Sequence, residues 1–261
     1  MSAANTLRAR AIGSFEAIAV HMHQALLLLR RRRIIVFTLA LLGLPVVIAA
    51  VALAARAFGA ALFRQTLRLY TDFLLLLVPA IHLAPAVGEE IDARTFTYVF
   101  ARPAARWTMP VGKLLATVAV LSAVAAMSVL LTYFVSMLRD LSEVASALPL
   151  LGRGLLLSLL GPIAFGALSM AVGTIFPRRP VVATLVYLLV VDGIFGHIPG
   201  FLKVVSLSFH LRVVAGIHQP DGAYDPNPDM WFSVLVLIGA SALLTWLGSL
   251  VTGTTEYRTD K

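Results

Sequence analysis

The charged side chains between Gly88 and Lys113 are arranged by sign along the chain. Three carboxylates come first and four cations follow: Glu89, Glu90 and Asp92, then Arg94, Arg102, Arg106 and Lys113. A short helix is stabilised by negative charge at its start and positive charge at its end. Groups of this kind act by ion pairing with another surface rather than by making or breaking bonds.

Between the two sets of charges lies the short run Thr95–Ala101, which carries Phe96, Tyr98 and Phe100. Pro103 ends a helix here, because proline disfavours helical backbone at the residue before it. Pro110 can open the next helix. The pattern predicts a short helix at a membrane surface, bracketed by two membrane-spanning helices.

Three ionisable residues fall inside the apolar runs that flank this stretch or follow it: Asp72, His82 and Asp192. Ionisable groups within spans are candidates for a translocation path. His82, between two prolines, could instead be a neutral histidine bonded to a carbonyl that a proline has freed. Asp72 and Asp192 could equally be helix-end residues at the interface.

Catalytic and metal-binding motifs are missing from the sequence. Gly112-Lys113 is followed by Leu114, and Trp107 stands where a phosphate-binding loop needs glycine. There is no nucleophile elbow, no HExxH pair and no cysteine. We therefore expect a non-catalytic chain with no bound metal or cofactor. His21 and His23 point to different helix faces, so they form no convincing metal site.

The composition is that of a polytopic membrane protein. Of the 261 residues, 59% are hydrophobic and 13% are charged, whereas a soluble domain has about 25% charged residues. The net charge of +8 in so apolar a chain is better explained by basic loops facing an anionic lipid leaflet than by nucleic acid. The partner that composition implies is the lipid bilayer.

We expect an all-α fold forming one transmembrane domain over residues 1–261. A helix over about 12–33 has apolar residues three and four apart on one face, which is typical of an interfacial helix. Six spans follow at about 34–55, 70–87, 111–138, 154–176, 181–195 and 230–251. The intervening 56–69 is predicted to be a short outer loop with a helical turn or two at the interface, and 139–153 is predicted to be a short outer loop. The amphipathic stretch 196–228 predicts short helices that dip into the outer leaflet.

The distribution of basic residues sets the expected orientation. With both termini in the cytoplasm, 14 of the 21 Lys and Arg residues lie inside and 7 outside. The block Arg30–Arg33 directly before the first apolar run fixes the amino terminus on the inner side. We expect a multi-pass protein of the bacterial cytoplasmic (inner) membrane.

The polar stretch resembles the permease subunits of type-2 ATP-binding-cassette (ABC) transporters. In that family a Glu is followed by Gly-Thr, hydrophobic residues, Arg or Pro, Arg, and Gly-Lys at the start of a long span. Here the matching residues are Glu89 or Glu90, Thr95, Arg102-Pro103, Arg106 and Gly112-Lys113, with Arg94 in place of the usual glycine. The six-span layout extends the resemblance to nearly the whole chain.

The resemblance implies an elbow helix, a cytoplasmic coupling helix in a coupling segment over 88–110, and re-entrant outer helices before the last span. It implies a separate cytosolic ATPase that binds ATP and Mg²⁺, and a second copy of this chain or a related permease. Glu89 or Glu90 would pair with a basic residue of the ATPase, and the three aromatic residues would fill an apolar cleft. Arg102, Arg106 and Lys113 would hold the segment to lipid or to the elbow helix.

The exported substrate would be a lipid or hydrophobic compound, because the residues that could line a path are apolar. Two alternatives stay open at this point. The chain could be a membrane scaffold or assembly factor that docks a cytosolic partner without ATP-driven transport. A lipid-modifying enzyme is disfavoured by the missing motifs.

Overall fold

The computed structural model describes residues 14–31, 34–86, 88, 106–196, 198, 200–218 and 226–254. Of these, 87% are helical and none is in a strand, which confirms the all-α prediction for the described part of the chain. Within that part, five helices are long and apolar enough to cross a membrane. The protein is therefore a multi-pass membrane protein on the evidence of its helices.

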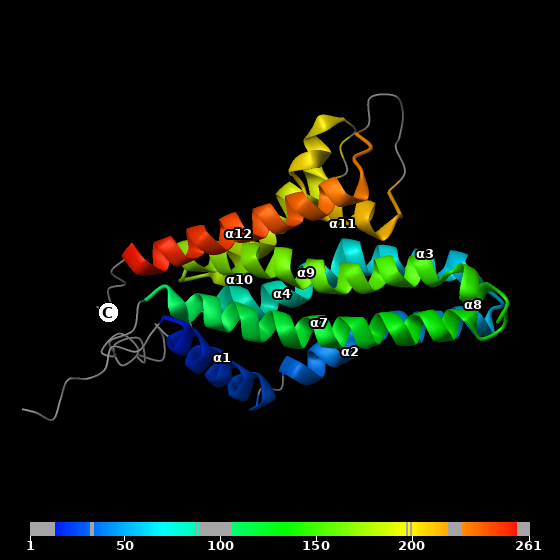
Figure 1. Ribbon diagram of the computed structural model, residues 1–261, viewed down its shortest axis with the longest axis horizontal. Coiled ribbons are helices and arrows are strands. Elements are labelled where there is room, and N and C mark those ends of the chain that lie inside the picture. The colour runs from blue at the N-terminus through cyan, green and yellow to red at the C-terminus, as the bar shows by residue number, and fades with distance from the viewer. Residues whose placement is uncertain are drawn as a thin grey trace, which may run out of the picture.

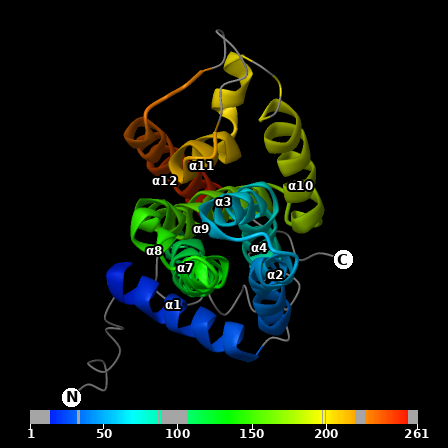
Figure 2. The same cartoon turned by 90° about the vertical axis from the view of Figure 1, so that its right-hand side faces the viewer.

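The first helix, α1 (Ser14–Arg31), lies across the bundle rather than along it (Figures 1 and 2). It crosses α7 (Thr108–Met137) at Gly112, where a Cβ atom would lie 2.7 Å from His21 Cβ and 2.9 Å from the Ile18 carbonyl oxygen. A glycine is required for backbones to approach this closely. The predicted helix over 12–33 is confirmed as a helix, and its place at a membrane surface stays a prediction.

The helix α2 (Ile34–Ala54) matches the first predicted span and continues to a turn at Arg56. The prediction of a loop over 56–69 is wrong for most of that range. A single helical stretch begins at Gly59 and ends at Ala86. It consists of four consecutive parts: α3 (Gly59–Leu69), the π-helix η1 (Tyr70–Leu74), α4 (Leu75–Leu83) and the 3-10 helix η2 (Ala84–Ala86).

The reason for this longer helix is the spacing of its buried residues. Leu62, Phe63, Thr66 and Leu67 recur at helical intervals and are buried, while the two arginines of α3 point outward. Polar arginines made the segment look like a loop, but they occupy only the exposed face of an amphipathic helix.

The predicted outer loop over 139–153 is also shorter than expected. After α7 come a single turn, α8 (Glu143–Ser146), and then α9 (Leu148–Ile175), which starts six residues before the predicted span. The helix α9 is the centre of the bundle. In its most apolar 18-residue stretch 72% of the residues are buried, compared with 22% in the corresponding stretches of α2 and of α12 (Met230–Thr254).

The fifth predicted span corresponds to α10 (Pro180–Tyr187) continued by the π-helix η3 (Leu188–Phe195). These 16 residues rise only about 24 Å, less than the roughly 30 Å of a bilayer core. The chain then forms the 3-10 helix η4 (Phe201–Val205) and the helix α11 (Leu207–Ala215) before α12. The short outer helices are thus confirmed as helices, and their depth in a membrane stays a prediction.

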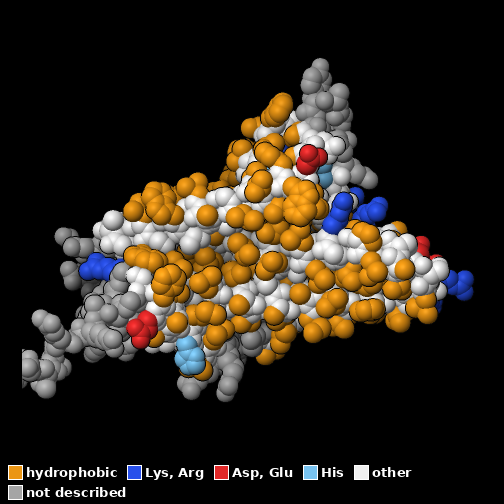
Figure 3. All heavy atoms as spheres, in the orientation of Figure 1, with side chains coloured by type: hydrophobic (Ala, Val, Ile, Leu, Met, Phe, Trp, Pro, Cys, Tyr) orange, Lys and Arg blue, Asp and Glu red, His pale blue; other side chains and the backbone are white. Residues whose placement is uncertain are grey.

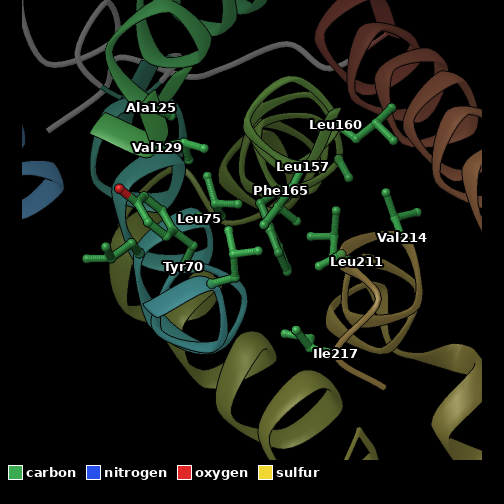
Figure 4. Close-up of a cluster of buried hydrophobic side chains, with 14 of the residues drawn as sticks. Tyr70, Leu75, Ala125, Val129, Leu157, Leu160, Phe165, Leu211, Val214 and Ile217 are labelled. Carbon is green, nitrogen blue, oxygen red and sulfur yellow. The ribbon is translucent and has the colours of Figure 1, made fainter. Parts of the chain in front are cut away.

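The apolar core lies where η1, α4, α7, α9 and α11 meet (Figure 4). Tyr70, Leu75, Val129, Phe165 and Leu211 are all buried there, and each comes from a different element. The core therefore joins the outer helix α11 to three of the long helices.

Two ends of the bundle are named here by their residues. The inner end carries Gly88, Thr108, Ile175, Pro180 and Thr254, and the outer end carries the 55–58 turn and α8, as Figure 1 shows. Between the two ends the surface is a broad band of hydrophobic side chains (Figure 3). The long helices alternate in direction between these ends, in agreement with a polytopic chain.

Candidate functional site at the inner end

The candidate site is formed by the described residues on either side of the predicted coupling segment (residues 88–110). Its predicted contact residues Glu89, Glu90, Arg94, Thr95, Phe96, Tyr98, Phe100, Arg102 and Pro103 lie outside the described residues. Gly88 and residues 106–110 are described, and so is Lys113. The structure therefore shows how the segment is anchored at its two ends.

Lys113 connects the two ends of the segment. Its ammonium Nζ donates a hydrogen bond of 2.6 Å to the carbonyl oxygen of Ala86, which is 27 residues earlier in the chain. Ala86 ends η2, and Lys113 belongs to the first turns of α7. This hydrogen bond, which is stronger than a neutral one because its donor is charged, thus joins the described chain on either side of the segment.

Close glycine contacts hold the same base to the rest of the bundle. A Cβ at Gly173 of α9 would lie 2.0 Å from the carbonyl oxygen of Ala84, and a Cβ at Gly88 would lie 2.8 Å from that of Pro177. Both contacts are backbone against backbone, where no flexible side chain can move aside. The start of the segment is therefore packed directly on α9 and on the turn that follows it.

Gly173 belongs to a longer series of glycines on α9. A Cβ at Gly161 would meet Leu75, and one at Gly166 would meet Leu83, in both cases within 3.0 Å. These two glycines thus allow close helix approach at the α4–α9 contact. Small residues are the usual means of tight helix packing in membranes.

The inner end also has a large apolar groove between α7, α9 and α12. Its volume is about 900 Å³. Its walls include Trp107 just before α7, Leu115 of α7, Ile163 of α9, and Ile238 and Trp246 of α12. Ser249 lines it as well, and its hydroxyl Oγ is buried without a hydrogen-bond partner in the described structure. The groove could accept an apolar molecule with a small polar group.

The structure separates His82 from the two aspartates that the sequence grouped with it. His82 of α4 is buried, and its Nε2 is hydrogen-bonded to Thr38 Oγ1 of α2 at 2.7 Å. Asp72 lies ten residues earlier in the same helical stretch, which corresponds to about 15 Å. The three predicted path residues therefore do not form one site.

Asp72 and Asp192 instead converge on a residue that the sequence did not single out, Arg212 of α11. Arg212 Nη1 lies 3.6 Å from Asp72 Oδ1, and its Nη2 donates a hydrogen bond of 2.6 Å to the Gly196 carbonyl. Burial lowers the pKa of Arg212, whereas both aspartates favour its charged form and raise that pKa. Lone arginines in amphipathic stretches are common, so no sequence signal marked this one.

Asp192 also holds the amino-terminal end of α11. Its Oδ1 accepts hydrogen bonds from Ser206 Oγ at 2.6 Å and from the Ser208 backbone N–H at 2.9 Å. A carboxylate in this position satisfies an N–H that has no partner within the helix. Both aspartates lie in π-helical segments, η1 and η3, which are frequent at functional positions.

His210 of α11 is buried. Its Nε2 lies 3.0 Å from the Val204 carbonyl oxygen, to which it donates, and its Nδ1 lies 3.2 Å from Ser233 Oγ. Burial lowers the pKa of His210, and the hydrogen bond to Val204 opposes this shift. The neutral ring therefore connects η4, α11 and α12.

Sequence comparison adds no relative, since neither a protein-family profile nor a curated protein matches this chain.

Proposed function

We propose that this chain is the permease subunit of a type-2 ABC transporter, in which a separate cytosolic ATPase docks on the coupling segment. The single observation that carries the proposal is the closed base of that segment. The Lys113–Ala86 hydrogen bond joins its two ends, and the glycine contacts join them to α1 and α9. A force on the segment would therefore act on several long helices together.

In this mechanism the ATPase binds the Glu89 and Glu90 carboxylates through a basic residue and seats Phe96, Tyr98 and Phe100 in an apolar cleft. ATP and Mg²⁺ bind to the ATPase and not to this chain. Closure of two ATPases pushes the segment, and α7 rotates about its contact with α1 at Gly112. The inner end is then the cytoplasmic end, and both termini lie in the cytoplasm of a bacterial inner membrane.

Two copies of the chain, or this chain and a related permease, pair in the proposed transporter. The helices α2 and α12 have the largest exposed apolar faces of the five candidate spans and are available for pairing. The groove between α7, α9 and α12 supports a lipid or hydrophobic substrate, because it is apolar, is large, and opens on the side of the bundle. Export is the direction that the family resemblance implies.

The test is purification of the tagged protein from its native host in mild detergent. Mass spectrometry of the sample should identify a stoichiometric chain with a phosphate-binding loop, and the sample should hydrolyse ATP in a vanadate-sensitive way. E89A/E90A should lower the co-purified ATPase at least about tenfold, because truncating one side of a buried ion pair costs about 2 kcal/mol or more. Thermal unfolding of the permease itself should be unchanged.

Glu16→Ala is the matched control, since Glu16 is an exposed carboxylate on α1 that lies outside the segment. It should leave the ATPase yield unaltered. A pure protein with no ATPase partner, or an E89A/E90A variant that retains full ATPase binding and coupling, would refute the proposal.

A further inference from the structure

The turn between α9 and α10 forms a second, smaller hollow at the inner end, which we call the turn pocket. It has a volume of about 390 Å³. It is lined by the following seven residues: Ile175, Phe176, Pro177, Arg178, Arg179, Val182 and Ala183. The pocket therefore combines an apolar wall with two guanidinium groups.

Both arginines are available to a ligand. Arg178 and Arg179 are exposed, and neither guanidinium makes a hydrogen bond or an ion pair with the part of the chain that the structure describes. They directly precede α10, which has Pro180 in its first turn. The N–H groups of a helix's first turn have no partner within the helix and carry partial positive charge. The local field thus favours an anion.

The apolar wall indicates what kind of anion fits. Ile175, Phe176 and Val182 are 52%, 55% and 57% exposed, which is a large apolar area beside two charges. The exposed surface continues along one face of the helix from Val182 through Val186 to Leu189. An inorganic anion would leave this surface uncovered, whereas an acyl chain would cover it.

We propose that the turn pocket binds an acidic membrane phospholipid. Its headgroup phosphate contacts Arg178 and Arg179, and one acyl chain lies along the 182–186–189 face of α10–η3. Arginine suits this role because its planar guanidinium can donate two parallel hydrogen bonds to phosphate oxygens. Basic pockets next to spanning helices are a general means of acidic-lipid recognition.

A lipid in the turn pocket would lie beside the backbone on which Gly88 packs. The Pro177 carbonyl, which belongs to the pocket turn, is the group against which Gly88 packs. A lipid that orders this turn would therefore also order the start of residues 88–110. Lipid binding itself does not depend on the ABC transporter proposal and can be measured without any ATPase.

The experiment uses the full-length protein in dodecyl maltoside, titrated with dioleoyl phosphatidylglycerol or with dioleoyl phosphatidylcholine. Lipid adducts are counted by native mass spectrometry, and Tm is followed in parallel. We expect the wild type to bind phosphatidylglycerol in preference to phosphatidylcholine. Its Tm should be higher with phosphatidylglycerol than with phosphatidylcholine. R178Q/R179Q should weaken phosphatidylglycerol binding about tenfold or more, because each basic residue near an anionic headgroup contributes measurably to binding.

Two further variants decide the interpretation. R64Q/R68Q removes the same charge from exposed arginines of α3, outside the turn pocket, and should keep the wild-type preference. Val182→Trp keeps both arginines but fills the pocket, and should weaken binding of the whole lipid. This variant also tests the site if R178Q/R179Q does not fold.

Three outcomes would overturn the proposal. Equal losses of phosphatidylglycerol binding in R64Q/R68Q and R178Q/R179Q would mean that binding depends only on the net charge of the protein. An equal rise in Tm with inorganic phosphate would mean that a soluble anion, and not a lipid, is the ligand. Unchanged phosphatidylglycerol binding in both R178Q/R179Q and Val182→Trp would place any lipid elsewhere.

Discussion

The inner end of the bundle and the short helix α11 are held in place by different kinds of contact. At the inner end, Gly173 packs directly on the Ala84 backbone, and Gly112 packs on His21 Cβ and the Ile18 carbonyl of α1. At the outer side, α11 is held by side-chain groups, namely the Arg212–Asp72 ion pair and the Asp192 cap. The inner end is thus held by close packing at glycines, whereas α11 is held by an ion pair and hydrogen bonds.

This difference shows how each region can respond to a load. Close-packed backbones cannot separate without opening a void, so helices joined at glycines move together. An ion pair and a helix cap can break and form again at modest cost, because their groups can be hydrated when released. In the proposed transporter, the inner end would transmit motion and α11 would be the part that can open.

The largest effect on stability is expected from Gly173→Ala, which disrupts the contact between α9 and η2 at the inner end. Its Cβ would overlap the Ala84 carbonyl oxygen, so α9 and η2 must separate. We expect a loss of about 3 kcal/mol in the free energy of unfolding, at the upper end of overpacking effects. Thermal unfolding in dodecyl maltoside, followed by intrinsic fluorescence, measures this.

Gly43→Ala is the control, because a Cβ there has nothing within 4 Å. It should be neutral or stabilising by up to about 1 kcal/mol, since alanine favours helix over glycine. Similar Tm values for the two alanine variants would show that the inner end is not tightly packed.

A smaller and more local effect is expected at the outer side from Arg212→Met. The change removes the ion pair with Asp72 and the hydrogen bond to Gly196, and should cost about 1–3 kcal/mol. Hydrogen exchange should accelerate in α11 while α9 stays protected. Asp72→Asn should cost less, and the double variant should cost less than the sum of the two.

Arg64→Met controls for the loss of an exposed arginine and should change exchange in α11 little. If α11 keeps its protection in Arg212→Met, its attachment depends on apolar packing alone, and the contrast between the two ends disappears.

The smallest effect is a pH dependence from His210. Because burial lowers its folded-state pKa, the unfolded chain takes up a proton near pH 6.5 while the folded chain does not. Stability therefore falls as the pH drops through about 6.5, because the folded chain binds this proton less readily than the unfolded chain. Tm measured from pH 8 to 5.5 should show a steeper fall for the wild type than for His210→Gln. Parallel curves would mean that His210 does not contribute to the pH dependence of stability.

The helices themselves were largely predictable from the sequence. Long apolar runs predicted six spans, of which five correspond to helices long and apolar enough to cross a membrane, with most ends agreeing to within a few residues; the fifth predicted span corresponds to the shorter α10–η3. The errors fell at 59–69 and at 148–153, where helices extend beyond the apolar run. In the first case one helical face is polar and the other is buried, which a search for uniformly apolar segments does not detect.

The candidate site was predictable only in part. The charge order over 88–113 indicated where a partner would dock, but the Lys113–Ala86 hydrogen bond joins residues 27 apart and has no local signature. The same holds for Arg212, whose partners lie on two other elements. Long-range pairs of this kind depend on how the helices cross.

The sequence by itself therefore determined that the chain is helical, resides in a membrane, and carries one polar segment between its second and third apolar runs. Those properties follow from local composition and periodicity, since burial in lipid requires apolar helices whatever their neighbours are. Only the tertiary structure decided which helix is central, which glycines touch another backbone, and that two distant aspartates share Arg212. These depend on the packing of one helix against another, and the sequence of a single helix does not contain that information.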